Sequence, residues 1–369
     1  MNQLFRWDQM GLFLLALAAG ILPFAVPEVC AAALREGLTL CSGPLLLSLF
    51  PFLVVSRLLI QCPESDLLAL PFRLAAWGIG IRTPCAARVL CIGFLGGFAP
   101  AASAAAQAVR TGQLTAEEAD ALLPACICSG PSFVVLTVGQ SLLGSAELGV
   151  LLFASQITAN YLTAALLNRF AGVHSVKPGS AAQASPAPPR LDEILADAAI
   201  TYCKLCGFIL FFRLLAAGAG ALLPTGAGTL CAILLEVCSG CDLASRTGQW
   251  GSLLCCAALS VQGLSVLLQV RTICPAEMTL RPLYRARMLH LPLSLALFYL
   301  LLPGGEADVF STLPARVLLM RRVPPDCALL VFAVCCMAAC TLRSGIRQVE
   351  QKQMARNAGG CCINSKTLL

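Results

Sequence analysis

The residues with the clearest capacity for chemistry are polar groups set inside apolar segments. Glu236, in LEVCSGCD (235–242), stands at the end of the uncharged run 214–235. An ionisable group this near the membrane core is a functional candidate, and a position at the membrane surface is its alternative. Ser129 and Gly130 precede the point where an apolar helix is expected to restart. The N-terminus of a restarted helix attracts anions, so these residues are candidates for binding a solute.

A second polar set lies in SVQGLSVLLQV (260–270). Gln262, Ser265 and Gln269 recur at three- and four-residue spacing, which predicts one shared helical face, and Gly263 follows the first of them. A polar face in an apolar helix must meet protein or water. It either joins neighbouring helices by hydrogen bonds or lines a solute pathway, and both readings stay open.

Basic residues precede a proline in LYRARMLHLPL. Arg285, Arg287 and His290 would form a cationic mouth for an acidic solute if they faced a pathway. In the alternative reading, the arginines extend to lipid headgroups and His290 is a buried hydrogen-bond donor.

Motifs for enzymatic catalysis do not occur in a suitable context. The chain has no Walker loop, dinucleotide-binding fingerprint, HExxH or GxSxG arrangement. Its 21 cysteines lie mostly in apolar runs, where Cys acts as a small hydrophobe, and only two histidines accompany them. Basic residues are spread without the density of a nucleic-acid surface. We expect no enzymatic activity, no bound metal or cofactor, and no nucleic-acid partner.

The elements that must position these residues are membrane helices. Charged residues make up 12% of the 369 residues and hydrophobic residues 58%, whereas soluble domains carry about 25% charged residues. Windows without Asp, Glu, Lys or Arg cover 9–27, 37–56, 89–109, 121–146, 214–235, 247–270, 288–305 and 327–342. The sequence therefore predicts an all-α polytopic membrane protein with about eight to eleven membrane-embedded helices.

A Ser-, Ala- and Pro-rich segment at 172–190 predicts a linker between two membrane halves. We expect a first repeat at 1–171, a second at 191–345 and a polar tail at 346–369. A constant shift along the sequence places Val109-Arg110-Thr111 on Val270-Arg271-Thr272. Two inverted repeats in this register would put Arg110 and Arg271 on opposite membrane faces, because matched interrupted segments are typical of inverted-repeat transporters.

Interruptions are expected inside individual spans. Gly96 and Gly97, in GFLGGFAPAA (93–102), predict a helix break, with close helix packing as the alternative. Thr115 and Glu118 form a capping box for the next helix. That helix, its break and its restart predict a re-entrant hairpin with Ser129 at the tip. A matching hairpin is expected around Pro292, dipping in from the opposite side.

The order and spacing of these segments resemble the YlbJ-type sporulation integral membrane proteins, which carry the nucleoside-recognition gate domain. The resemblance runs from about Pro27 to Leu301 through PEVCAAALREGL, LFPFLVVSRLL, GFLGGFAPAA, LTAEEADALLPACICSGPSF, LEVCSG, QGLSVLLQV and YRARMLH. It implies a bacterial inverted-repeat fold akin to concentrative nucleoside transporters. It also implies movement of dipicolinic acid across the outer forespore membrane. Cys126-Ile127-Cys128 departs from the amide that family members tend to carry before SGP, which puts the substrate in question.

The leading hypothesis is a passive or ion-coupled carrier in the lipid bilayer for a small carboxylated aromatic such as dipicolinate. The segments around Gly96 and Ser129 would form one half of the site, and Gln262 to Ser265 the other. Two rivals remain: a nucleoside or other polar-metabolite transporter of the same fold, and a sporulation membrane scaffold that moves nothing.

Overall fold

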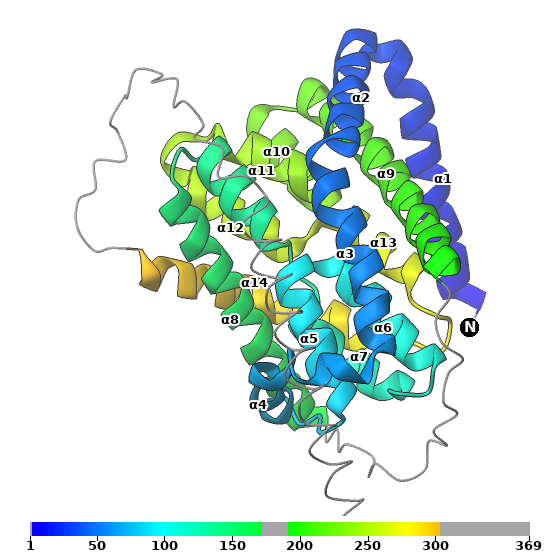
Figure 1. Ribbon diagram of the computed structural model, residues 1–369. Coiled ribbons are helices and arrows are strands. Elements are labelled where there is room, and N and C mark those ends of the chain that lie inside the picture. The colour runs from blue at the N-terminus through cyan, green and yellow to red at the C-terminus, as the bar shows by residue number, and fades with distance from the viewer. Residues whose placement is uncertain (1, 172–190, 303–369) are drawn as a thin grey trace, which may run out of the picture.

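The computed structural model describes residues 2–171 and 191–302, and every regular element in these ranges is a helix (Figure 1). The α-helices are α1 (Asn2–Ala25), α2 (Pro27–Ser42), α3 (Pro44–Gln61), α4 (Leu70–Gly78), α5 (Pro84–Gly96), α6 (Phe98–Arg110), α7 (Ala116–Cys126), α8 (Ala146–Ala171), α9 (Leu191–Leu222), α10 (Thr225–Leu235), α11 (Val237–Ser245), α12 (Gly251–Val261), α13 (Gly263–Ile273) and α14 (Arg281–Leu301). Shorter elements are the 3₁₀-helices η1 (Pro63–Asp66) and η3 (Gly248–Trp250) and the π-helix η2 (Ser132–Leu142). The expected linker 172–190, the part of the second repeat after 302 and the tail 346–369 lie outside the described residues.

The predicted all-helical class is confirmed, and the long apolar helices indicate an integral multi-pass membrane protein. Within the described ranges, three segments are long and apolar enough to cross a membrane: Ala146–Ala171, Leu191–Leu222 and Gly248–Ile273. A fourth is added if the pair Phe13–Ala25 and Pro27–Ser42, bent by 113°, counts as one span.

Helices α5 and α6 form a hairpin with its tip at Gly97. Arg88, near the start of α5, donates a hydrogen bond of 2.8 Å to the side chain of Gln113, just beyond the end of α6. The two open ends therefore lie together. At the tip, Gly97 has a φ of 80°, and an added Cβ would lie 2.7 Å from the nitrogen of Gly130. Only glycine combines this conformation with this close approach.

The next segment is an interrupted span. The predicted capping box at Thr115 is present and begins α7, which ends before Ile127. Along the continuous helix α8, Gly149 packs on Gly139 of η2, while Asn168 donates to the carbonyl of Ala121 in α7 at 3.1 Å. The start of α8 therefore lies beside η2, and its end lies beside α7. The chain thus continues in one direction from α7 to η2, antiparallel to α8. The expectation of a hairpin tipped by Ser129 is wrong, because the chain changes direction at Gly97 instead.

The same two arrangements recur later in the chain. Helices α10 and α11 form a second hairpin with Glu236 at its tip, since an added Cβ on Gly240 would lie 2.8 Å from Cα of Ile233. Helices α12 and α13 form a second interrupted span, broken at Gln262, which has a left-handed φ of 66°.

Helix α14 does not show the break expected near Pro292. It runs from Arg281 to Leu301 with Pro292 inside it. Its buried residues Arg287, His290 and Ser294 all make hydrogen bonds to α8 or the interrupted spans. Proline removes one backbone hydrogen bond and kinks a helix, and the flanking contacts hold this helix continuous.

The predicted placement of Arg110 and Arg271 on opposite faces is also wrong. Arg110, at the end of α6, lines the same cavity as Thr272 in α13, so these helix ends lie on one side. The shared Val-Arg-Thr sequence pairs the second arm of a hairpin with the second half of an interrupted span. These two elements are not equivalent in the structure.

The two hairpins enter from opposite ends of α9. Near the start of α9, Asp197 and Lys204 share a cavity with Arg110 of the first hairpin. Near its end, Gly220 packs on Gly228 at the start of the second hairpin. Figure 1 shows α5 and α6 toward the bottom of the bundle and α10 and α11 toward the top.

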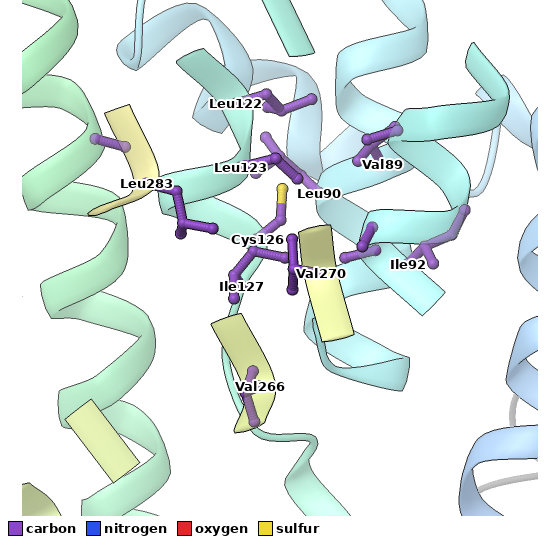
Figure 2. Packing of buried hydrophobic residues seen from close by; sticks show 14 of the residues in the cluster. Val89, Leu90, Ile92, Leu122, Leu123, Cys126, Ile127, Val266, Val270 and Leu283 are labelled. Carbon is purple, nitrogen blue, oxygen red and sulfur yellow. The ribbon is translucent and has the colours of Figure 1, made fainter. Parts of the chain in front are cut away.

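The main core surrounds the interruptions and is built from small and branched residues. Figure 2 shows Cys126 and Ile127, at the end of α7, beside Val266 and Val270 of α13. Helix α6 contributes alanines that are nearly all inaccessible to solvent: Ala99, Ala101, Ala102, Ala104, Ala105, Ala106 and Ala108. Such short side chains allow close packing between helix backbones.

Candidate functional site between the helix interruptions

A cavity of about 70 Å³ lies where the hairpin tips meet the interrupted spans. Its polar lining comes from Ser129, Ser132, Glu236 and Gln269. Its apolar lining includes Leu45, Leu49, Phe52, Leu95, Phe98, Phe133, Ile209, Val237 and Val266. An apolar enclosure with a few polar groups is the usual composition of a small-molecule site.

The predicted site residues fall into three groups. Gly96, Ser129, Gly130, Glu236 and Gln269 line the cavity. A second group stands directly behind it: Gly97, Gln262, Gly263 and Ser265. Arg285, Arg287 and His290 lie on α14, outside the lining.

Each hairpin tip packs on the interruption of the neighbouring span. Gly97 approaches Gly130, and an added Cβ on Gly263 would lie 2.9 Å from the nitrogen of Glu236. Gln262 donates to the hydroxyl of Ser129 at 3.5 Å, which joins the two interrupted spans. The breaks thus expose their polar backbone toward one small region, as happens where a transporter binds its solute.

Glu236 is 2% exposed and caps helix α11. Its carboxylate accepts hydrogen bonds from the backbone nitrogens of Cys238 at 2.8 Å and Ser239 at 2.7 Å. Backbone donors and the positive end of the helix dipole stabilise a carboxylate at this position. Glu236 is therefore a buried acid at the wall of the cavity, and not a residue of the membrane surface.

Gln262, Ser265 and Gln269 do not share one helical face, because the break at Gln262 separates it from α13. Within α13, Gln269 donates to the hydroxyl of Ser265 at 2.8 Å. The carbonyl oxygens of both Gln262 and Gln269 are buried and have no protein partner. Unpaired buried acceptors are costly, so these two atoms suit a ligand, an ion or water.

Arg285 and Arg287 do not form a joint mouth. Arg285 is exposed, whereas Arg287 is 7% exposed and lies between the interrupted spans. Arg287 donates to the carbonyl of Ile127 at 2.6 Å and to that of Ser260 at 3.3 Å. Its Nε atom has no partner, and no ion pair involves it among the described residues. Arg287 therefore places a positive charge behind the cavity.

His290 lies one turn further along α14 and its Nε2 atom is 3.2 Å from the carbonyl oxygen of Gln156. It is buried, and its Nδ1 atom has no protein partner. This environment supports the reading of His290 as a buried structural group.

A polar stripe on α8 was missed by the sequence reasoning. Gln156 donates to the hydroxyl of Ser260 at 3.0 Å, and Asn160 donates to the carbonyl of Ile127 at 3.3 Å. Gln156, Asn160 and Thr163 recur at four- and three-residue spacing in an apolar helix, so their periodicity was a usable signal. The stripe connects α8 to both interrupted spans.

No group of three metal-ligating side chains occurs within 2–171 and 191–302. No protein-family model, curated protein or solved structure matches the chain.

Proposed function

We propose that this chain is a membrane carrier for a small anionic metabolite, with its binding site in the central cavity. The observation that carries the proposal is the meeting of two hairpin tips and two interrupted spans around one cavity. Free backbone groups at membrane depth are tolerated where they line such a cavity.

The order of elements supports two inverted repeats. Each half contains a hairpin, an interrupted span and a long helix: α5 to α8 first, then α10 to α14. The hairpins enter from opposite ends of α9. In this arrangement either half can open the site to its own side, which is the basis of alternating access.

Charge supports an acidic solute accompanied by a cation. Arg287 supplies a fixed positive charge behind the cavity, near the break before Ser129. Glu236 and the unpaired amide oxygen of Gln269 supply acceptors on the other walls, and the unpaired amide oxygen of Gln262 lies behind them. We propose that a proton or metal cation binds at Glu236 while the anion binds toward Ser129, so that little net charge is buried.

The proposed solute is a small aromatic carboxylate such as dipicolinate, in line with the resemblance to sporulation membrane proteins. A nucleoside is the second candidate, because Glu236 and the amide oxygens would accept hydrogen bonds from ribose hydroxyls. The cavity of about 70 Å³ is smaller than the ~300 Å³ at which ligand pockets usually begin. Binding of either solute requires the hairpins to move apart.

Uptake into proteoliposomes tests the proposal. Purified protein is reconstituted, and accumulation of labelled dipicolinate and labelled uridine is measured with and without a pH gradient. The proposal expects dipicolinate uptake that Gln269→Ala reduces and that Gln249→Ala, at an exposed position, leaves unchanged. Uridine uptake alone would select the second candidate. Accumulation no greater than in protein-free liposomes, for both compounds, would favour the scaffold hypothesis.

A further inference from the structure

A second cavity, of about 160 Å³, opens at the end of the bundle where α6 and α13 end. Its lining residues are Arg57, Ser103, Ala106, Arg110, Asp197, Ile200, Thr201, Lys204, Leu205, Thr272 and Ile273. We call it the vestibule.

The vestibule is positively charged. Arg57, Arg110 and Lys204 face a single carboxylate, that of Asp197. Asp197 pairs with Arg57, whose Nη2 atom also donates to the hydroxyl of Thr201 at 3.4 Å. Arg110 and Lys204 are exposed, and neither has an ion pair within the described ranges. A concave surface lined by one sign of charge raises the local concentration of opposite ions.

The vestibule and the central cavity are aligned along the same four helices. Each helix lines both cavities with residues three to five positions apart: Arg57 and Phe52 in α3, Ser103 and Phe98 in α6, Leu205 and Ile209 in α9, and Thr272 and Gln269 in α13. At 1.5 Å per residue, about 5–8 Å separate the two linings along each helix. The cavities are therefore consecutive along one path.

The material between them is an apolar layer. Leu53, Ala99 and Leu205 are at most 1% exposed and belong to one packed cluster, in which Phe98 also packs. The side chains of Leu53, Ala99 and Leu205 have no polar atom to replace the hydration of an anion, so a charged solute cannot pass between them without rearrangement.

We infer that the vestibule captures anions on one side of the carrier and that the layer of Leu53, Ala99 and Leu205 is the closed gate to the central cavity. The inference rests on the proposed carrier function and names the side from which the anion approaches. The ligand class is a small carboxylate or phosphate, because guanidinium and ammonium groups recognise both. Alternating access then requires α3, α6, α9 and α13 to separate at this layer.

Reactivity of introduced cysteines tests the charge of the vestibule without any transport assay. Thr272→Cys is labelled with an anionic and with a cationic methanethiosulfonate reagent, and peptide mass spectrometry identifies the labelled residue among the native cysteines. We expect the anionic-to-cationic rate ratio at this site to exceed the ratio at Gln249→Cys by about 3–10-fold. Replacing Arg110 and Lys204 by Gln should abolish the excess, whereas Arg246→Gln should not.

Liposomes of neutral phosphatidylcholine distinguish the two sources of an anionic ligand. If the anionic-to-cationic rate ratio at Thr272→Cys stays high in these neutral liposomes, the vestibule captures a free anion. High salt should then lower the ratio by screening. A rate ratio at Thr272→Cys that stays the same when Arg110 and Lys204 are replaced by Gln would overturn the inference. So would an excess seen only with anionic lipids present, because the vestibule would then bind lipid headgroups.

Labelling of Gln269→Cys in the central cavity tests the gate. Leu53→Ala should increase its labelling rate by about 3–10-fold, since the cavity left by the removed side chain is not fully refilled. Leu53→Val should give a smaller increase of the same sign, and Leu58→Ala, outside the layer, should give none. Equal rates in all variants would refute the gate. Intact anion uptake together with a Thr272→Cys rate ratio that does not respond to replacement of Arg110 and Lys204 would refute only the vestibule, whereas absent uptake would refute the carrier function itself.

Discussion

Arg287 of α14 donates a hydrogen bond of 2.6 Å to the carbonyl oxygen of Ile127, where α7 ends. The same guanidinium donates to the carbonyl oxygen of Ser260, the last residue but one of α12, at 3.3 Å. Backbone groups freed by a helix break must find partners inside the protein. One buried cation therefore satisfies carbonyl groups of both interrupted spans.

Arg287→Gln should lower the unfolding temperature in detergent, because it removes the guanidinium donor from the carbonyls of Ile127 and Ser260, and the carbonyl of Ile127 keeps only the longer bond from Asn160. Losing one such partner costs about 1–3 kcal/mol. Arg285→Gln is the matched control, since Arg285 is exposed on the same helix and should change stability by less than about 0.5 kcal/mol. Equal shifts for both variants, measured by thermal unfolding, would contradict the bridging role.

Gly97→Ala should destabilise the protein more than Gly112→Ala does. Both glycines have a positive φ, 80° and 70°, but Gly97 also has a ψ of −164°, in a region almost restricted to glycine. At Gly97 the new Cβ would in addition lie 2.7 Å from the nitrogen of Gly130, whereas at Gly112 nothing lies within 4 Å. The difference between the two unfolding temperatures measures the combined backbone strain and contact at the hairpin tip. Equal effects would show that the tip has room for a side chain.

Glu236→Gln should remove the effect of a pH gradient on uptake while leaving the fold intact. The glutamine oxygen can still accept a hydrogen bond from the start of α11, so the loss of stability should stay near 1 kcal/mol or less. Uptake measured at several external pH values provides the readout. A response to pH that matches the unmodified protein would assign proton coupling to another group.

Asp120→Ala should destabilise the connection between α7 and α14. Asp120 accepts hydrogen bonds from the nitrogen and hydroxyl of Thr279, at 2.8 and 2.7 Å, and from the nitrogen of Leu280 at 3.1 Å. Leu280 has a left-handed φ of 56°, a conformation that must be held by its surroundings. We expect a loss of about 1–3 kcal/mol in thermal unfolding. Glu117→Ala, exposed on the same helix, serves as the control.

Local chemistry made part of this structure predictable. The break at Gly97 and the capping box at Thr115 follow from residue types within a few positions, and both are present. The apolar composition predicted about eight to eleven membrane-embedded helices, and three segments, or four with the bent pair, of the described residues are long and apolar enough to cross a membrane. Glu236 was singled out because it ends the uncharged run 214–235, and it borders the cavity.

Features that depend on chain direction were not predictable. Glycine and proline mark an interruption, but the contact that decides between a hairpin and a continuing span lies far away in sequence. For α7 and η2 that contact is the continuous helix α8, through Asn168 and Gly149. The placement of Arg110 failed for the same reason, because three matching residues do not specify the direction of the helices that carry them.

The alanine surface of α6 bears on how the first hairpin moves. Helices usually lock together because long side chains on one fit between those of the other, and sliding requires these side chains to change rotamer. The buried face of α6 consists mostly of alanine methyl groups, which are too short to interlock in this way. We expect the hairpin to shift along its own axis in small steps with few rotamer changes. The alanine surface would therefore let this hairpin slide while the side chains of the other helices stay interlocked.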